Sequence, residues 1–136
     1  MIKSKKQSLP SQDFHWGELI GTADFRRNFM EKEAVTISLE GNALRAVLPR
    51  DIDHHAAKFI RGSIDRSFVE NMPRRLILDF SCVSFMDSSG VGLIIGRSEL
   101  ARKYGSVTEL VGISPDIMRL VRICGVERIK DLYILQ

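Results

Sequence analysis

The chain has 136 residues, of which 44% are hydrophobic and 27% charged, and it carries a net charge of +3. These values are ordinary for one soluble globular domain with a single core. Much of the positive charge comes from Lys3, Lys5 and Lys6 in a polar N-terminus, so we expect no nucleic-acid surface. No apolar run reaches eighteen residues and no apolar segment follows the basic N-terminus, so neither a membrane span nor a signal peptide is expected.

The first 34 residues are predicted to form an extension, followed by a compact domain over residues 35–136. Met1–Asp13 is polar and is expected to be mobile. Phe14–Lys32 has apolar residues at helical spacing and is predicted to be a helix. Gly17 and Gly21 weaken that prediction, since each costs about 1 kcal/mol against alanine. Two interpretations stay open for this helix: it packs on the following domain, or it serves self-association or partner docking.

The compact domain is predicted to begin with a β-hairpin. Val35–Leu39 is rich in β-branched residues, Glu40–Asn42 is a turn, and Ala43–Leu48 forms the second strand. Asp53 is then predicted to cap a helix that runs to about Glu70. The expected buried face of that helix consists of Ala57, Ile60, Ile64 and Phe68.

The second half of the domain alternates strands with helices. Arg75–Phe80 is nearly all apolar, as in a strand covered on both faces. Four further elements are predicted after this strand: a helix over Gly90–Tyr104, a strand over Val107–Val111, a helix opened by Ser114 and a strand over Leu132–Leu135. The apolar positions of the first of these helices are Val91, Ile94, Ile95, Ala101 and Tyr104. The second is expected to have a buried stripe of Ile117, Leu120, Val121 and Cys124. This order predicts an α/β fold with parallel strands joined by right-handed crossovers.

The two cysteines, Cys82 and Cys124, lack the spacing of a metal site. The chain has cytosolic character, so both are predicted to be reduced, half-buried thiols.

The stretch Phe85–Gly92 lies where a strand passes into a helix. Asp87 is predicted to cap that helix, which places Ser88 and Ser89 in its first turn. A helix N-terminus favours anions, so this position suits phosphate chemistry or partner recognition. A phosphate on Ser88 is expected to leave the fold intact and to change any surface docked there.

Three glycines, Gly90, Gly92 and Gly96, follow within the same helix. Three glycines are costly in a helix unless something approaches its backbone closely. Two interpretations stay open: tight packing of the helix on the sheet, or a smooth docking face for a partner.

Three separated stretches resemble bacterial anti-sigma-factor antagonists with a STAS domain, over roughly Val35 to Leu135. The first is Phe85–Gly92, with the segments on either side of it. The second is Asp51–His55, and the third is Ile113–Pro115 together with Gly125 and Val126. The resemblance implies a STAS-type mixed β-sheet with helices packed on it.

The resemblance also implies a cytoplasmic partner-switching protein that is not an enzyme and has no cofactor or metal. The unphosphorylated form would bind an anti-sigma factor and release the sigma factor. The anti-sigma factor would be a serine kinase that itself binds ATP and magnesium. It would phosphorylate Ser88, and a phosphatase would reset the switch. The implied partner-binding residues are Asp51, Asp53, His54, His55, Asp87, Ser88, Ser89, Gly90 and Gly92.

Members of that family commonly have a helix after the last strand, whereas this sequence stops at Gln136. We hypothesise that Phe14–Met30 covers the apolar surface which that helix would cover.

Three other functions compete with partner switching. A serine hydrolase is disfavoured because the G-x-S-x-G motif is missing and no histidine has triad spacing. A phosphate-accepting receiver built on Asp79 and Asp87 lacks an acidic magnesium pair. A STAS scaffold or subunit of a signalling or lipid-transport complex, working without phosphorylation, stays open.

Overall fold

The structure is a computed structural model that describes residues 34–136. The helix predicted over Phe14–Lys32, with its packing or self-association, lies outside the described residues. The division into residues 1–34 and 35–136 therefore stays a prediction. Among the described residues, no helix is long and apolar enough to cross a membrane.

The domain begins with the predicted hairpin. Strand β1 (Thr36–Glu40) pairs antiparallel with β2 (Ala43–Val47), and Thr36 lies opposite Val47. Gly41 closes the turn at a φ of 63°, a left-handed conformation that glycine adopts without steric cost. The turn chemistry therefore sets the register of the predicted hairpin.

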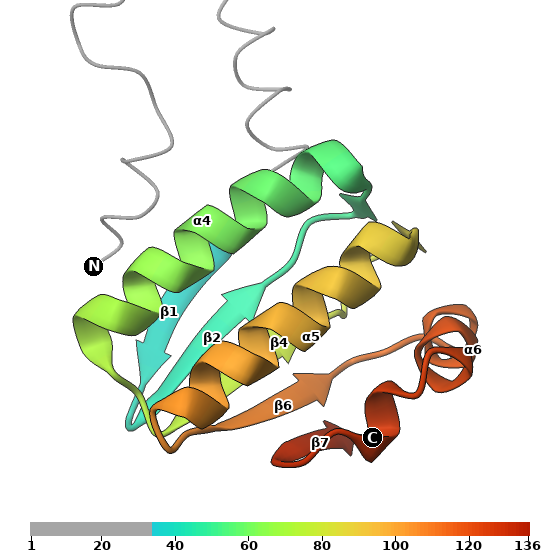
Figure 1. Cartoon of the computed structure of the whole chain (residues 1–136). Coiled ribbons are helices and arrows are strands. Elements are labelled where there is room, and N and C mark those ends of the chain that lie inside the picture. The colour runs from blue at the N-terminus through green and yellow to red at the C-terminus, as the bar shows by residue number, and fades with distance from the viewer. Residues whose placement is uncertain (1–33) are drawn as a thin grey trace, which may run out of the picture.

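The five-stranded sheet has the order β1-β2-β4-β6-β7. The three further strands are β4 (Arg75–Asp79), β6 (Val107–Val111) and β7 (Leu132–Leu135). They run parallel to β2 and to one another, so only the first strand is antiparallel. This mixed sheet confirms the predicted fold class (Figure 1).

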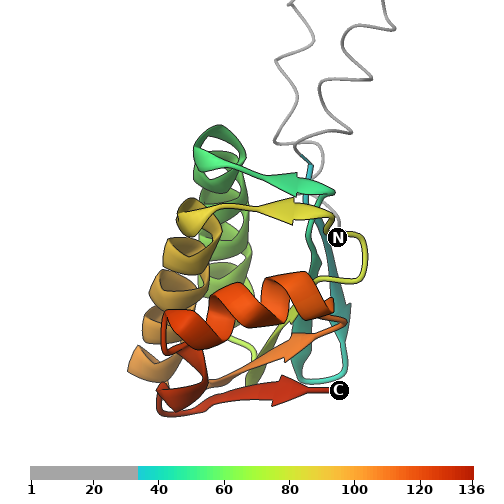
Figure 2. The ribbon, with the colours of Figure 1, turned by 90° about the vertical axis from the view of Figure 1, so that its right-hand side faces the viewer.

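Helices α4 (His54–Asn71) and α5 (Ser88–Lys103) lie side by side on one face of the sheet. Figure 2 shows this layer and the sheet edge-on. Helix α6 (Pro115–Ile123) and a short 3-10 turn, η1 (Val126–Arg128), lie toward the β6–β7 side. Ser114 caps α6 by accepting a hydrogen bond from the Ile117 amide at 3.3 Å, as the sequence predicted.

The core lies between the sheet and the two long helices. Its fully buried large side chains include Leu44, Ile60, Phe68, Leu78, Ile94 and Leu110. The central strand β4 was predicted to be covered on both faces, and its apolar side chains are buried on both. Ile77 is buried, but on the opposite face from Leu76 and Leu78, where the register places it between Arg45 and Glu109. Side chains of neighbouring strands therefore help to cover that face.

The predicted burial was wrong for both cysteines. Cys124 is exposed, because α6 ends at Ile123. It lies one position past the helix, where the buried stripe no longer continues. Cys82 is also exposed, so the two free thiols are not half-buried. On α4, the predicted face is confirmed: Ile60, Ile64 and Phe68 are buried, and Ala57 is partly buried and packs against the core. Ala56 is buried as well.

Candidate functional site

A two-stranded parallel ribbon joins two loops that are distant in sequence. Strand β3 (Asp51–Ile52) pairs with β5 (Phe85–Met86), with Asp51 opposite Phe85. The Asp87 amide continues the pairing by donating to the Ile52 carbonyl at 3.2 Å. The ribbon spans from the sheet layer to the helix layer in Figure 2. The loop Asp51–His55 therefore lies beside the serine motif, which makes the surface composite.

Each ribbon strand passes through one aspartate into a helix. Asp53 Oδ1 accepts a hydrogen bond from the Ala56 amide, and Asp87 Oδ1 accepts one from the Ser89 amide, both at 2.8 Å. The two caps have nearly the same backbone conformation, with φ and ψ of −102° and −174° at Asp53 and −101° and −168° at Asp87. Because the preceding strands are paired and parallel, the positive ends of two helix dipoles lie at one site.

The two serines of the motif have different environments. Ser88 is the first residue of α5 and is exposed. Ser89 is partly buried and its amide is already bonded to the Asp87 carboxylate. An incoming phosphoryl group can therefore reach the Ser88 hydroxyl more readily. The nearby helix dipoles would then stabilise the added negative charge.

The three glycines of α5 lie in different surroundings, so the absence of a side chain has a different explanation at Gly90 than at the other two. A Cβ on Gly90 would collide with Cγ and Sδ of Met86 and lie 3.3 Å from Ile52. The helix start therefore packs on the ribbon only if that side chain is absent. A Cβ on Gly92 or on Gly96 would meet nothing within 4 Å. Tight packing thus accounts for Gly90 alone, and an open helix surface remains at the other two.

Gly92 is exposed and lies one helical turn beyond Ser88. No internal contact in the described residues explains the absence of a side chain there. A glycine at this position lets another surface approach the α5 backbone next to the serine. This is the geometry that the docking interpretation requires.

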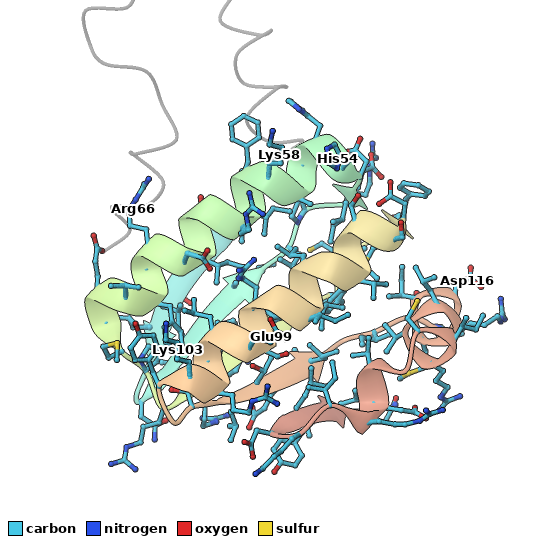
Figure 3. The ribbon with its side chains drawn as sticks, in the orientation of Figure 1. His54, Lys58, Arg66, Glu99, Lys103 and Asp116 are labelled. Atoms are coloured by element: carbon cyan, nitrogen blue, oxygen red, sulfur yellow. The ribbon has the colours of Figure 1, made fainter. Side chains whose placement is uncertain are left out.

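The first turn of α4 supplies the other half of the surface. His54 and His55 are both exposed there, and Figure 3 shows His54 at the α4 end nearest the start of α5. The His55 ring meets the Phe59 ring edge-on, with centroids 5.3 Å apart and planes at 80°. This contact holds one imidazole against the helix. Among residues 34–136, no cluster of His, Cys, Asp or Glu could hold a metal ion.

One exposed residue at the site was not among the predicted binding residues. Phe85 is 51% exposed, whereas its neighbour Met86 is 6% exposed. Asp51, opposite Phe85 in the ribbon, is partly buried, and its carboxylate lies 3.8 Å from Arg50 Nε. The alternation of an outward Phe85 and an inward Met86 follows from the strand period, but a two-residue strand is too short to reveal that period in sequence.

Asp79, at the end of β4, has a structural environment. Its carboxylate accepts hydrogen bonds from the Ser81 amide at 2.9 Å and the Ser81 hydroxyl at 2.7 Å, and from Arg45 Nη1 at 2.8 Å. Burial alone would raise the pKa of Asp79, but the bonds from Ser81 and Arg45 outweigh it and lower that pKa. Asp79 thus braces the start of the loop that leads to the serine motif.

The fold and the site together define a small α/β domain with an exposed serine at paired helix N-termini. Residues 40–133 match the STAS domain family. An anti-sigma F factor antagonist from Lysinibacillus sphaericus is 31% identical over 101 residues, which span 74% of this chain and 79% of that relative. The chain therefore belongs to the STAS domain family.

Two solved structures of one protein are also similar to this chain. The anti-sigma factor antagonist SpoIIAA in its unphosphorylated form has a TM-score of 0.65 and 27% identity, covering 76% of this chain and 89% of that one. The Bacillus cell fate determinant SpoIIAA in its phosphorylated form has a TM-score of 0.60 and 27% identity, covering 76% and 92%. The same fold is thus known with and without a phosphate.

Proposed function

We propose that this protein is an anti-sigma-factor antagonist whose unmodified form binds an anti-sigma factor and is switched off by phosphorylation of Ser88. The observation that carries the proposal is the exposed Ser88 at the first position of α5, beside the start of α4. The names of the similar proteins, together with SpoIIAA in unphosphorylated and phosphorylated forms, support it.

The physical basis of the switch is that a phosphate on Ser88 has a low energetic cost in the free protein and a high one in the complex, where the partner covers Ser88. In the free protein the phosphate is solvated and lies at two helix N-termini, so the fold tolerates it. In the complex the same group would have to lose its water against the partner. Burying a single ion effectively costs several kcal/mol. A differential affinity of about 5.5 kcal/mol changes a mostly bound protein into a mostly free one.

The proposed partner surface combines both helix starts. Ser88, Ser89, Gly90 and Gly92 would come from α5, and Asp53, His54 and His55 from the cap and first turn of α4, with Asp51 and Asp87 between them. Phe85 extends this surface with an exposed aromatic ring, a residue type that often anchors protein interfaces. The protein would be a cytoplasmic substrate and ligand, not an enzyme. ATP and magnesium would belong to the kinase, and a separate phosphatase would reset Ser88.

The experiment uses three matched baits: the tagged wild-type chain, Ser88→Ala and Ser88→Glu. They are expressed in the host, and captured proteins are identified by mass spectrometry. A serine kinase should be captured by the wild type and Ser88→Ala and lost with Ser88→Glu. The purified kinase, given ATP and magnesium, should then phosphorylate wild type and Ser89→Ala on Ser88 and leave Ser88→Ala unmodified. Phosphate on Ser89, or equal capture by all three baits, contradicts the proposal.

A further inference from the structure

A buried ion pair joins the two helices whose N-termini form the site. Arg97 of α5 places Nε 2.7 Å from Oδ1 of Asp65 on α4. Arg97 is only 8% exposed, although arginine is rarely buried to that extent. The Asp65 side chain is 38% exposed. The Arg97 end of the pair is therefore buried between the helices, whereas the Asp65 end is partly open to solvent.

This pair is a poor source of stability. Although Nε and Oδ1 are close, neither atom has a properly aligned hydrogen bond, and both are shielded from solvent. Burial raises the pKa of Asp65, opposed by Arg97 and Arg61, and burial lowers the pKa of Arg97, opposed mainly by Asp65. Loss of water is thus the largest effect on each group. Well-packed apolar residues often stabilise a fold as much as such a pair, or more.

The position of the pair suggests what it contributes instead. The β3–β5 ribbon already fixes the two helices at their N-termini. Asp65 lies eleven residues after His54, and Arg97 lies nine residues after Ser88. At 1.5 Å per residue, the pair is about 14–17 Å along the helices from the site. Two fixed points determine the angle and axial register of α4 against α5, whereas the ribbon alone leaves the angle to apolar packing.

We propose that Asp65 and Arg97 are positioning residues that hold α4 and α5 in one register and so place the His54–His55 turn relative to Ser88. Apolar attraction is non-directional, whereas a buried charge that loses its partner is heavily destabilised. Only arrangements that keep the charges together are therefore populated. The effect on a partner rests on the proposed function, but the effect on helix orientation does not.

The test compares Asp65→Leu, Arg97→Met and the double variant, with Arg61→Gln as the control. Arg61 is an exposed cation on α4, near the pair. Asp65→Leu should be clearly less stable to urea than wild type, because it leaves the buried Arg97 charge unpaired. Arg97→Met should be destabilised less, because the Asp65 side chain is 38% exposed. The double variant should be about as stable as wild type or more so. Residual dipolar couplings of backbone amides then give the angle between α4 and α5. That angle should change in the double variant and stay unchanged in Arg61→Gln.

The second readout is the rate at which the captured kinase phosphorylates Ser88. The double variant should show a kcat/KM about tenfold lower or more, since small misplacements of reacting groups are costly. Arg61→Gln should keep the wild-type value.

A wild-type helix angle in a stable double variant overturns the positioning role. Should the double variant not fold, the helix angle is measured in Asp65→Leu, which leaves Arg97 unpaired, and an unchanged angle there also overturns the positioning role. A changed angle supports the role even where the wild type is not phosphorylated, an outcome that instead counts against the proposed function.

Discussion

The starts of α4 and α5 have nearly the same backbone geometry but carry different side chains. Each follows one strand of the ribbon, and each begins after an aspartate cap of nearly the same conformation. Beyond the cap, α4 presents two exposed imidazoles, whereas α5 presents an exposed hydroxyl followed by glycines. One helix start offers side chains for contact. The α5 start offers a serine for modification, next to glycines that have no side chains. The proposed switch requires both helix starts together.

The largest stability effect is expected where α5 packs on the ribbon. Gly90→Ala should lower the free energy of unfolding by about 1–3 kcal/mol, because its Cβ collides with the buried Met86 side chain. Gly92→Ala is the matched control: its Cβ meets nothing, and alanine favours a helix by about 1 kcal/mol. Urea unfolding measures both. Equal effects of the two substitutions would mean that the glycines do not have different roles.

The second effect concerns β2 and β4, the two strands of the main sheet that lead into the ribbon. Arg45 on β2 and Asp79 on β4 tie these strands together at 2.8 Å. Asp79→Asn should lower the free energy of unfolding by about 1–2 kcal/mol at pH 7. Since the folded-state pKa of Asp79 is lowered from 3.8, this stabilisation is present above pH 3.8 and is lost as the pH falls through the lowered pKa.

Urea unfolding of wild type and Asp79→Asn over a pH series measures the effect. Comparing the two proteins isolates Asp79 from Asp65, whose raised pKa acts with the opposite sign. A stability difference that stays constant down to the lowest pH would show that the ionised Asp79 is not the stabilising form.

The caps test whether the two helix starts are equivalent. Asp53→Ala and Asp87→Ala should each lower the free energy of unfolding by about 1 kcal/mol, because each leaves one amide of the first turn without its acceptor. Thermal unfolding of both variants gives the comparison. A cost more than twice as large at one cap would show that the two starts share geometry but not energetics.

The smallest stability effect is expected at the functional serine. Ser88→Glu should change the free energy of unfolding by less than about 0.5 kcal/mol, since Ser88 is exposed and a helix N-terminus tolerates negative charge. The same variant should lose its partner. A destabilisation above 1 kcal/mol would mean that the charge acts by unfolding the site rather than by blocking docking.

The sequence predicted the hairpin, the long helices and their caps because each has a strong local signal. Asp53, Asp87 and Ser114 all accept the amide bonds expected of a cap. The β3–β5 ribbon has no such signal, because each strand has two residues. The closeness of its two loops followed only from the family resemblance.

Other features needed the three-dimensional arrangement. Nothing local separates Gly90 from Gly92, since the difference is the Met86 side chain beneath only one of them. Charged residues are normally placed on the surface, so the burial of Arg97 against Asp65 was not expected. Cys124 was misplaced because helix boundaries are uncertain by a residue or more.

The central claim is that a phosphate on Ser88 removes the partner without altering the fold. The most direct test is isothermal titration calorimetry of the captured kinase against the unmodified protein and against protein fully phosphorylated on Ser88, with amide spectra of both forms. We predict near-identical spectra outside the two helix starts and an affinity about 10⁴-fold lower for the phosphorylated form, the factor that corresponds to about 5.5 kcal/mol. Equal affinities for the two forms would contradict it.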